Sequence, residues 1–200
     1  EGTVTIVFQT VGASTKMMAE YEVGDSFRDF VGPLGCKSDL IDESKEELAA
    51  KKMLFIAGGV GTAPLLYFGK KLQEMGIRPT FLLGARSAKD LLQLDEFKQL
   101  GDVYCTTEDG SMGEKGFVTQ HTVLNEKQFD SIHTCGPKPM MVSVARYAKQ
   151  SGIECEVSLE NTMACGVGAC LCCVENTDEG HVCVCKEGPV FNIKKLLWQI

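Results

Sequence analysis

Four cysteines near the C-terminus have a spacing that could ligate an iron-sulfur cluster. They are Cys165, Cys170, Cys173 and Cys185, in the order C-x4-C-x2-C-x11-C. This is the plant-type spacing for the four thiolates of a [2Fe-2S] cluster. Gly166 and Gly168 lie between the first two cysteines, and glycines let a short loop curl so that its backbone N–H groups point at cluster sulfurs. The spacing therefore predicts electron transfer as the chemistry of this segment.

The spacing leaves two questions open. Four thiolates can also hold a structural zinc ion, although zinc sites usually contain two C-x2-C pairs and here only Cys170 and Cys173 form one. The register is the second question, because Cys183 could replace Cys185 as the fourth ligand and Cys172 lies next to the third. Cys172 could be a thiol near the cluster that does not bind it, or it could change which cysteines are the ligands. The sequence is compatible with both.

Length and charge narrow the class of protein. The chain has 200 residues and a net charge of −7. This length is enough for one or two domains with a buried core, and the acidic balance argues against nucleic acid as a partner. No apolar run approaches the roughly 20 residues of a membrane span. No signal peptide precedes the ten cysteines, so we expect a soluble, cytoplasmic protein in which Cys36, Cys105, Cys135 and Cys155 are reduced thiols.

From residue 51 onward, short apolar runs alternate with amphipathic stretches. The pattern predicts strands over residues 53–57, 80–84, 103–107, 131–135 and 155–159, and helices over 64–75, 90–100 and 139–150. Strands that alternate with helices in this way indicate an α/β fold with a parallel sheet buried on both faces. Ligands of such sheets bind at the C-terminal ends of the strands.

A glycine-rich turn follows the first predicted strand, with the sequence Gly58-Gly59-Val60-Gly61-Thr62-Ala63-Pro64. Such a turn lets backbone N–H groups approach a pyrophosphate, and the N-terminus of the next helix favours the negative charge. The sequence does not match G-x-G-x-x-G, so a tight structural turn is the alternative.

A second small-residue turn, Cys135-Gly136-Pro137, follows the fourth strand. Two such turns at neighbouring strand ends would form the two walls of one crevice, which predicts a dinucleotide site. Glu108 and Asp109 end the third strand and could also contact the nucleotide, although an ordinary polar loop would have the same sequence.

These residues together resemble the electron-transfer subunit of NAD-dependent (class 1B) dihydroorotate dehydrogenase, within the ferredoxin reductase superfamily. The resemblance covers essentially the whole chain. Its specific part is the tail, residues 160–170 and 184–191. In the family pattern, the cysteine followed by Lys-Glu-Gly-Pro-Val-Phe is the last cluster ligand, which selects Cys185 over Cys183.

The resemblance also implies which residues bind each nucleotide cofactor. Residues 58–64 would hold the NAD pyrophosphate, and Cys135, Gly136 and Pro137 would border the nicotinamide. FAD would contact Val7, Phe8 and Gln9 on a strand over residues 4–9, together with Ser14 and Thr15. Gly32, Pro33, Leu34 and Gly35 are similar to the segment that links the flavin barrel to the nucleotide domain. Gln9 and Ser14 replace a common arginine and glycine, and the first half of the barrel, with its Arg-Pro-Leu-Ser type segment, is missing from this chain.

The implied organisation is a partial FAD-binding β-barrel over residues 1–41, an NAD-binding α/β domain over 42–160 and a [2Fe-2S] domain over 161–200. The implied function belongs to pyrimidine biosynthesis. An FMN-containing dihydroorotate dehydrogenase catalytic subunit, in a heterotetramer with this chain, would supply electrons that reach NAD+ through [2Fe-2S] and FAD. The flavin is required because nicotinamide accepts a hydride whereas the cluster passes single electrons. No general base is needed, so we expect His121, His133 and His181 to be structural or solvated.

Two other functions remain as alternatives. The chain could be the flavin and iron-sulfur reductase subunit of another complex, such as a sulfide dehydrogenase or a hydrogenase. A non-enzymatic nucleotide-binding module with a structural zinc site is the alternative from another class.

Overall fold

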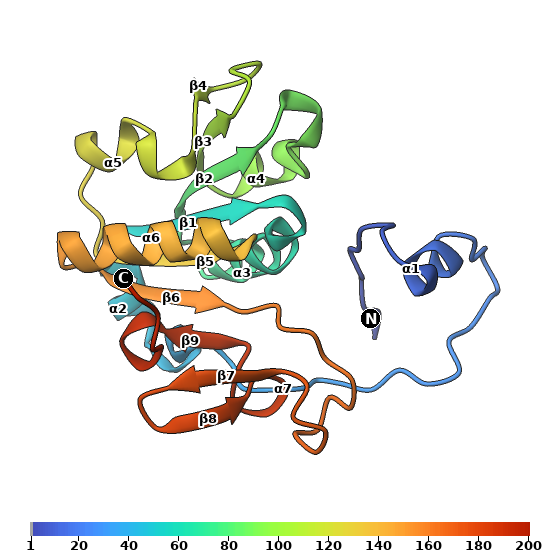
Figure 1. Cartoon of the computed structure of the whole chain (residues 1–200). Coiled ribbons are helices and arrows are strands. Elements are labelled where there is room, and N and C mark those ends of the chain that lie inside the picture. The colour runs from blue at the N-terminus through green and yellow to red at the C-terminus, as the bar shows by residue number, and fades with distance from the viewer. Residues whose placement is uncertain (1) are drawn as a thin grey trace.

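A seven-stranded sheet forms the centre of the computed structural model, which describes residues 2–200 (Figure 1). The strand order is β4-β3-β2-β1-β5-β6-β9. The strands are β1 (Met53–Gly58), β2 (Thr80–Ala85), β3 (Asp102–Thr107), β4 (Glu114–Lys115), β5 (Ser131–Cys135), β6 (Glu154–Ser158) and β9 (Val190–Asn192). Neighbouring strands are parallel except for β6 and β9. The predicted parallel sheet is confirmed, and the five predicted strands begin and end within one residue of the observed ones.

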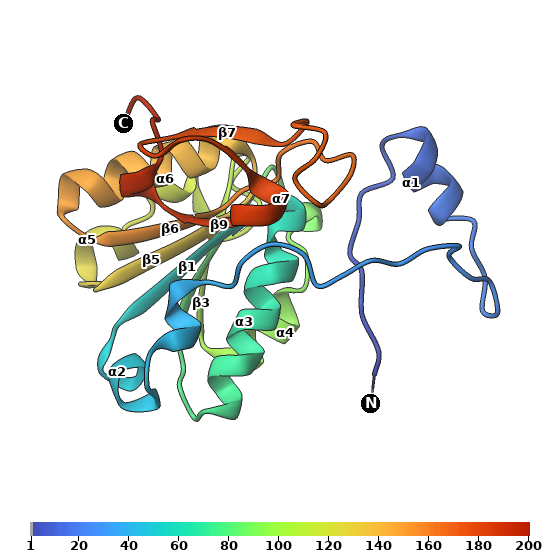
Figure 2. The same cartoon turned by 90° about the horizontal axis from the view of Figure 1, so that it is seen from below.

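Helices cover both faces of the sheet (Figure 2). On one face lie α3 (Thr62–Glu74) and α4 (Leu94–Leu100), and on the other α5 (Val123–Glu126) and α6 (Lys138–Ser151). Strand β1 is buried throughout, and its side chains alternate: Leu54 and Ile56 join the core under α6, whereas Phe55 and Ala57 join the core under α3 and α4. This alternation is the two-residue period of a strand that is covered on both sides.

Helix α4 begins four residues later than the pattern predicts. Residues Ala88–Asp90 form a separate 3-10 turn, η3, and Gln93 has a φ of 57° in the left-handed region. A residue in this conformation cannot continue a right-handed helix, so α4 starts after it. Two further short 3-10 turns near the strand ends are η2 (Gly59–Gly61) and η4 (Val118–Gln120).

The cysteine-rich tail is built into the main sheet. A hairpin of β7 (Val174–Thr177) and β8 (Gly180–Cys183) leads into α7 (Val184–Glu187), and β9 then pairs antiparallel with β6. Cys173, Cys185 and Phe191 lie in the same buried cluster as Leu54. The tail and the nucleotide-binding sheet therefore share one hydrophobic core.

The C-terminal residues pack against this same body. The sequence has apolar residues at helical spacing from residue 192 onward, but the structure forms a 3-10 turn, η5 (Ile193–Lys195), followed by extended chain. Leu196 is buried and bridges to Thr177, and Trp198 packs on the core below α6.

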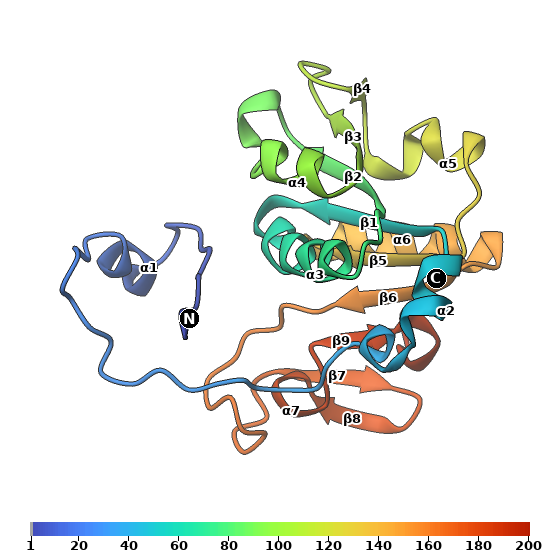
Figure 3. The ribbon, with the colours of Figure 1, turned by 180° about the vertical axis from the view of Figure 1, so that it is seen from behind.

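The N-terminal segment differs from the sequence prediction. Residues 2–37 contain one helix, α1 (Ala13–Met18), no strand and no buried side chain, and most of them, α1 included, lie apart from the sheet (Figures 1 and 3). The strand predicted over residues 4–9 is therefore wrong for this chain. A strand needs a neighbour to satisfy its backbone N–H and C=O groups, and no strand of the described residues pairs with this segment.

A short connection joins this segment to the sheet. It consists of a 3-10 turn, η1 (Asp39–Asp42), and α2 (Lys45–Ala50). Helix α2 is started by a capping box in which Ser44 and Glu47 exchange hydrogen bonds. Within residues 2–200, no helix has the length and apolar character to cross a bilayer.

Candidate functional site

The two small-residue turns meet at the C-terminal edge of the sheet, as the sequence predicts. Strands β1 and β5 are neighbours, and Ala57 pairs with Cys135. A Cβ atom on Gly61 would lie 2.4 Å from the Cys135 carbonyl oxygen. Only glycine therefore allows the turn after β1 to lie against the turn after β5.

A cavity of about 250 Å³ opens between these turns. Its lining includes the predicted residues Gln9, Gly58, Gly59, Gly61, Gly136 and Pro137, together with Val60, Lys138, Met141, Leu159, Glu160 and Asn161. The sequence prediction covers Val60, which lies within the turn over residues 58–64, but omits the other five residues of the second group as contact residues. Lys138 directly follows the second turn, and residues 159–161 follow β6, so the rule that ligands bind at strand ends could have found them.

The shape of the first turn fits a pyrophosphate. Gly59 has a φ of +57° and open space where a Cβ would be, and the Thr62 hydroxyl donates a hydrogen bond to the Gly59 carbonyl over 3.0 Å. Helix α3 begins at Thr62, so its positive N-terminal end faces this edge. The N–H groups at the start of α3 and the open space beside Gly59 fit a bound anion.

Cys135 lies beside the cavity rather than in its wall. Its side chain is buried, and burial raises the pKa of the thiol to about 11, against an opposing hydrogen bond with Ser158. The thiol is therefore protonated at neutral pH and is a poor nucleophile. A role in shaping the nicotinamide site stays a prediction.

The cysteine-rich loop directs backbone N–H groups at sulfur atoms. The N–H groups of Ala169 and Cys170 donate to the Cys165 sulfur over 3.3 and 3.4 Å. Hydrogen bonds from the loop backbone lower the pKa of the Cys165 thiol to about 6. Gly166 and Gly168 both have positive φ, as expected for a loop curled around its own sulfurs.

The four predicted ligands form two pairs. Cys165 hydrogen bonds with the Cys170 side chain, and Cys173 with the side chains of both Cys185 and Cys183. In residues 2–200, no three His, Cys, Asp or Glu side chains are grouped closely enough to hold a single metal ion. Pairing of the first two and of the last two predicted ligands is compatible with two irons that are each held by two thiolates.

Cys183 and Cys185 both contact Gly168, with opposite hydrogen-bond polarity. The Gly168 N–H group donates to the Cys185 sulfur over 3.2 Å, whereas the Cys183 thiol donates to the Gly168 carbonyl over 3.7 Å. A thiolate ligand is stabilised by N–H donors and destabilised by a facing carbonyl oxygen. Burial raises the pKa of both thiols, and only Cys185 has an N–H donor, that of Gly168, which opposes the rise. The contacts therefore favour Cys185 over Cys183 as the cluster ligand.

One polar network connects the cysteine loop with the nucleotide cavity. The Asn161 amide donates to the carbonyl oxygens of Cys173 and Val174 over 3.4 and 3.3 Å and to the Glu175 carboxylate over 3.1 Å. Glu175 is buried, and Lys138 lies 3.7 Å from its carboxylate. Asn161 and Lys138 both line the cavity.

The segment between α1 and η1 lies against the other side of the cysteine loop. The Cys36 thiol donates to the Lys186 carbonyl over 3.3 Å. A Cβ on Gly35 would lie 2.0 Å from the Gly188 carbonyl oxygen, and one on Gly166 would lie 2.9 Å from a Leu34 methyl group. The predicted linker residues Leu34 and Gly35 therefore contact the loop, with Gly32 and Pro33 exposed just before them.

Other predicted residues lie outside the cavity lining. Asp109 is exposed and accepts hydrogen bonds from the backbone and hydroxyl of Ser111, which lower the pKa of its carboxyl, and Glu108 is exposed beside it. Val7 and Ser14 are exposed, Phe8 is half-buried, and the Thr15 hydroxyl accepts a hydrogen bond from the Gly12 N–H at the start of α1. Thr62, Ala63 and Pro64 form the first turn of α3.

Family models match two parts of the chain. Residues 55–146 match the oxidoreductase NAD-binding domain, and residues 160–197 match the iron-sulfur cluster binding domain of dihydroorotate dehydrogenase B. The second match supports iron-sulfur over zinc. The parallel sheet, the two-turn cavity and the thiolate loop thus define an oxidoreductase subunit with a ferredoxin-reductase-like NAD-binding fold and an iron-sulfur segment.

Individual relatives identify the family. The chain is 38% identical over 197 residues to the dihydroorotate dehydrogenase B (NAD(+)) electron transfer subunit of Fusobacterium nucleatum, covering 96% of this chain and 73% of that one. It is 42% identical over 184 residues to the probable counterpart in Methanocaldococcus jannaschii, covering 90% and 67%. The chain belongs to the family of dihydroorotate dehydrogenase B electron transfer subunits.

A solved structure also resembles the chain. The structure of an NADH-dependent reduced ferredoxin-NADP oxidoreductase, studied for flavin-based electron bifurcation, has a TM-score of 0.82 and 32% identity, covering 96% of this chain and 67% of that one. This likeness confirms the predicted ferredoxin-reductase-like NAD-binding fold with its parallel sheet.

Proposed function

We propose that this chain transfers electrons from a dihydroorotate-oxidising partner subunit to NAD+, with a [2Fe-2S] cluster and FAD as its bound redox groups. The observation that carries the proposal is the pairing of four cysteines inside a cage of N–H donors, next to a two-turn nucleotide cavity. Bound there, the cluster would supply one-electron chemistry and the flavin would convert it to hydride chemistry, neither of which side chains provide.

Each part of the site has a defined task in this proposal. Cys165 and Cys170 would hold one iron, and Cys173 and Cys185 the other. Gly58, Gly59 and Gly61, with the N-terminus of α3, would hold the NAD pyrophosphate, and Gly136 and Pro137 would form the opposite wall. Asn161 would fix the cysteine loop relative to that wall through the carbonyl oxygens of Cys173 and Val174.

The FAD contacts are proposed from position. Gln9 lies at the nucleotide cavity, and Leu34 and Gly35 lie at the cysteine loop, so the segment between them reaches both sites. We assign Val7, Phe8, Gln9, Ser14 and Thr15 to FAD on this basis, together with the family pattern. Residues 42–160 and 161–200 share one hydrophobic core. We therefore propose the division into residues 1–41, 42–160 and 161–200 as a division by the cofactor that each part binds, and not as one into separately packed domains.

The partner is proposed from the relatives' names. Electron transfer subunits of dihydroorotate dehydrogenase B act with a dehydrogenase, and we propose an FMN-containing catalytic subunit in a heterotetramer. The likeness to the ferredoxin-NADP oxidoreductase supports a second candidate, in which the same relay serves a different complex.

Co-purification with a co-expressed catalytic subunit tests the proposal. We expect iron and sulfide in equal amounts, two irons per chain, bound flavin, and reduction of NAD+ that depends on dihydroorotate. A stable complex that contains these groups but reduces NAD+ only from another donor would support the second candidate. A colourless chain with bound zinc would refute both.

A further inference from the structure

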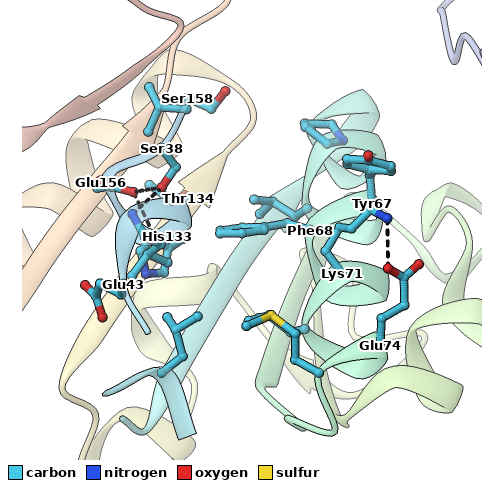
Figure 4. Close-up of a pocket in the computed structure, with 17 residues that line it drawn as sticks. Ser38, Glu43, Tyr67, Phe68, Lys71, Glu74, His133, Thr134, Glu156 and Ser158 are labelled. Atoms are coloured by element: carbon cyan, nitrogen blue, oxygen red, sulfur yellow. Dashed lines mark hydrogen bonds and ion pairs between the residues drawn. The ribbon is translucent and has the colours of Figure 1, made fainter. Parts of the chain in front are cut away.

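Polar groups on the floor of a larger cavity are engaged with one another. This cavity, of about 490 Å³, lies between α3 and residues 38–48 (Figure 4). The Ser38 hydroxyl donates to the Glu156 carboxylate over 2.7 Å, and His133 Nδ1 lies 3.2 Å from the same oxygen. This network belongs to the protein's own packing. A charged side chain that is shared between two sites occurs instead at the nucleotide cavity.

Lys138 carries the positive charge of the nucleotide cavity. Among the described residues that line this cavity, it is the only lysine or arginine, and Glu160 is the only acidic residue. Lys138 is the first residue of α6, and the N-terminal end of a helix adds a favourable field for an anion. The phosphates of a nucleotide in the cavity would therefore attract the Lys138 ammonium group.

The same ammonium group also faces a buried carboxylate. Lys138 Nζ lies 3.7 Å from Glu175 Oε2 and 5.7 Å from the centre of the Trp198 ring. The first distance is longer than a hydrogen bond, and the Lys138 side chain is 61% exposed. A long, exposed ion pair is weak, so a phosphate can compete with Glu175 for this ammonium group.

Glu175, in contrast, is fixed in position. Its side chain is 10% exposed, and its two oxygens accept hydrogen bonds from Trp198 Nε1 over 3.3 Å and from the Asn161 amide over 3.1 Å. Lys138 is the basic side chain that pairs with it in the described part of the chain. When Lys138 turns to a phosphate, the negative charge of Glu175 therefore stays in place with less compensation.

The Glu175 carboxylate is also linked to the cysteine loop. Glu175 lies on β7, two residues after Cys173. The Asn161 amide that binds its carboxylate also donates to the Cys173 carbonyl over 3.4 Å. Charge near an iron-sulfur cluster shifts the reduction potential of the cluster, and a buried charge is screened less than an exposed one. Loss of compensation at Glu175 would therefore make a cluster held by this loop harder to reduce.

We propose that Lys138 and Glu175 couple nucleotide binding to the reduction potential of the cluster, an inference that rests on the proposed function and deepens it. A bound nucleotide draws Lys138 away from Glu175. The midpoint potential of the cluster then falls, which favours electron transfer from the cluster toward the nucleotide. By linkage, reduction of the cluster weakens nucleotide binding by the same factor.

ADP-ribose tests the coupling, because it has the pyrophosphate of NAD but no nicotinamide to accept a hydride. The midpoint potential of the cluster in the full chain is measured with and without ADP-ribose, by redox titration followed by electron paramagnetic resonance. We expect a lower midpoint potential with ADP-ribose. By calorimetry, we expect a dissociation constant about fivefold higher for the reduced chain than for the oxidised chain. No shift, or a shift to higher potential, would overturn the proposal.

Lys138→Gln removes the shared charge and alters only an exposed side chain. It should weaken ADP-ribose binding to the oxidised chain about tenfold, as expected for loss of a hydrogen bond to a charged group, and should reduce the shift in midpoint potential. Lys70→Gln, at an exposed position of α3 outside the cavity lining, should change neither quantity. A shift of the parent's size in Lys138→Gln would contradict the proposal.

Glu175→Gln tests the other half of the pair. The neutral amide does not compete for Lys138, so ADP-ribose should bind more tightly and the shift in midpoint potential should disappear. Weaker binding would contradict the proposal. If this buried substitution prevents folding, Lys138→Gln still decides the question. A full chain without the paramagnetic signal would refute the proposed function, whereas a signal whose midpoint potential is indifferent to ADP-ribose would refute the coupling alone.

Discussion

Single residues decide whether the two walls of the nucleotide cavity can meet. Gly61 and Gly136 are both packed against the neighbouring strand's turn, and a Cβ on Gly136 would lie 2.9 Å from the Gly58 carbonyl oxygen. These glycines therefore allow the turns after β1 and β5 to lie close together, and they also allow a ligand to approach the backbone.

Gly61→Ala should disrupt the cavity. The added methyl group would lie 2.4 Å from a backbone oxygen, and overpacking of this kind costs about 1 to 3 kcal/mol. We expect a lower melting temperature and, by fluorescence titration, weaker binding of NADH. Gly12→Ala is the control, because that glycine has a φ of −116° and open space around its Cβ position. Equal effects of the two substitutions would contradict the structure.

Two neighbouring cysteines should differ in their effect on the cluster. Cys185→Ser should abolish the visible absorption of the cluster, whereas Cys183→Ser should retain it, because Cys185 accepts the Gly168 N–H and Cys183 faces a carbonyl. Iron content and electron paramagnetic resonance of the reduced protein measure the outcome. Cys172→Ser is the second control, and loss of the signal in that variant would mean that the ligand register is wrong.

His121 should make the fold sensitive to mild acid. Burial lowers the pKa of its imidazole below the ordinary value of 6.5, despite opposing effects from Glu114 and Glu126. The Val123 N–H donates to His121 Nδ1 over 2.9 Å, which requires that nitrogen to be unprotonated. The unfolded chain therefore binds the proton more readily than the folded chain, and stability falls as pH drops through about 6.5.

His121→Asn tests this pH effect, since the asparagine oxygen can replace Nδ1 as an acceptor and does not titrate. Urea unfolding between pH 7.5 and 5.5 should show a smaller loss of unfolding free energy for the variant than for the parent chain. Parallel curves would rule out this histidine as the cause.

At the scale of elements, helices and turns bring sequence-distant groups to one edge of the sheet. Helix α7 has only four residues, yet it places the Cys185 N–H 3.4 Å from the Cys173 sulfur. The loop after β6 then carries Asn161 between this pair of cysteines and the nucleotide cavity. This side-chain amide is therefore one of the links that hold the cysteine loop beside the cavity, in addition to the shared hydrophobic core.

Asn161→Ala should loosen the cysteine loop. The variant loses donors to Cys173, Val174 and Glu175, and lost hydrogen bonds of this kind cost about 1 to 2 kcal/mol, or roughly fivefold to thirtyfold in an equilibrium. We expect faster release of iron to a chelator by about that factor. Asn125→Ala, at an exposed position of α5, should leave the rate unchanged. A variant that keeps its iron as firmly as the parent would show that the amide is dispensable.

At the scale of the whole molecule, the chain consists of a packed body and an exposed N-terminal segment. Limited trypsin digestion should separate them. Arg28 has a fully exposed side chain, and no side chain from residue 2 to 37 is buried, so cleavage at Lys16, Arg28 and Lys37 should precede cleavage within the sheet. Mass spectrometry of the early fragments measures the order, and cleavage between residues 53 and 158 at the same rate would contradict this division.

The body could be predicted from the sequence because its signals are local. The buried strand β1 is a continuous apolar run, and β1 and β5 are each followed directly by a small-residue turn. The cysteine spacing likewise favoured a [2Fe-2S] cluster while leaving zinc open, and the family match then supported iron-sulfur.

Other features depend on contacts that no local pattern contains. The strand predicted over residues 4–9 needs a partner strand, and none of the described residues provides one. The role of Asn161 depends on where β6 ends relative to the cysteine loop. The choice between Cys183 and Cys185 depends on the direction of two hydrogen bonds at Gly168, which spacing cannot show.

The antiparallel strand β9 limits how the C-terminal tail of this protein can be removed or exchanged by gene fusion. It is encoded after the last predicted ligand, yet it covers the outer side of β6 through pairs such as Val157 with Phe191. A chain that ended at Glu160 would lose the cysteine-rich tail. It would also leave β6 as an unpaired edge strand, and unpaired edge strands promote aggregation. A gene fusion or deletion that removes the cysteine-rich tail must therefore supply another strand to pair with β6. The tail cannot be exchanged between proteins as an independent module.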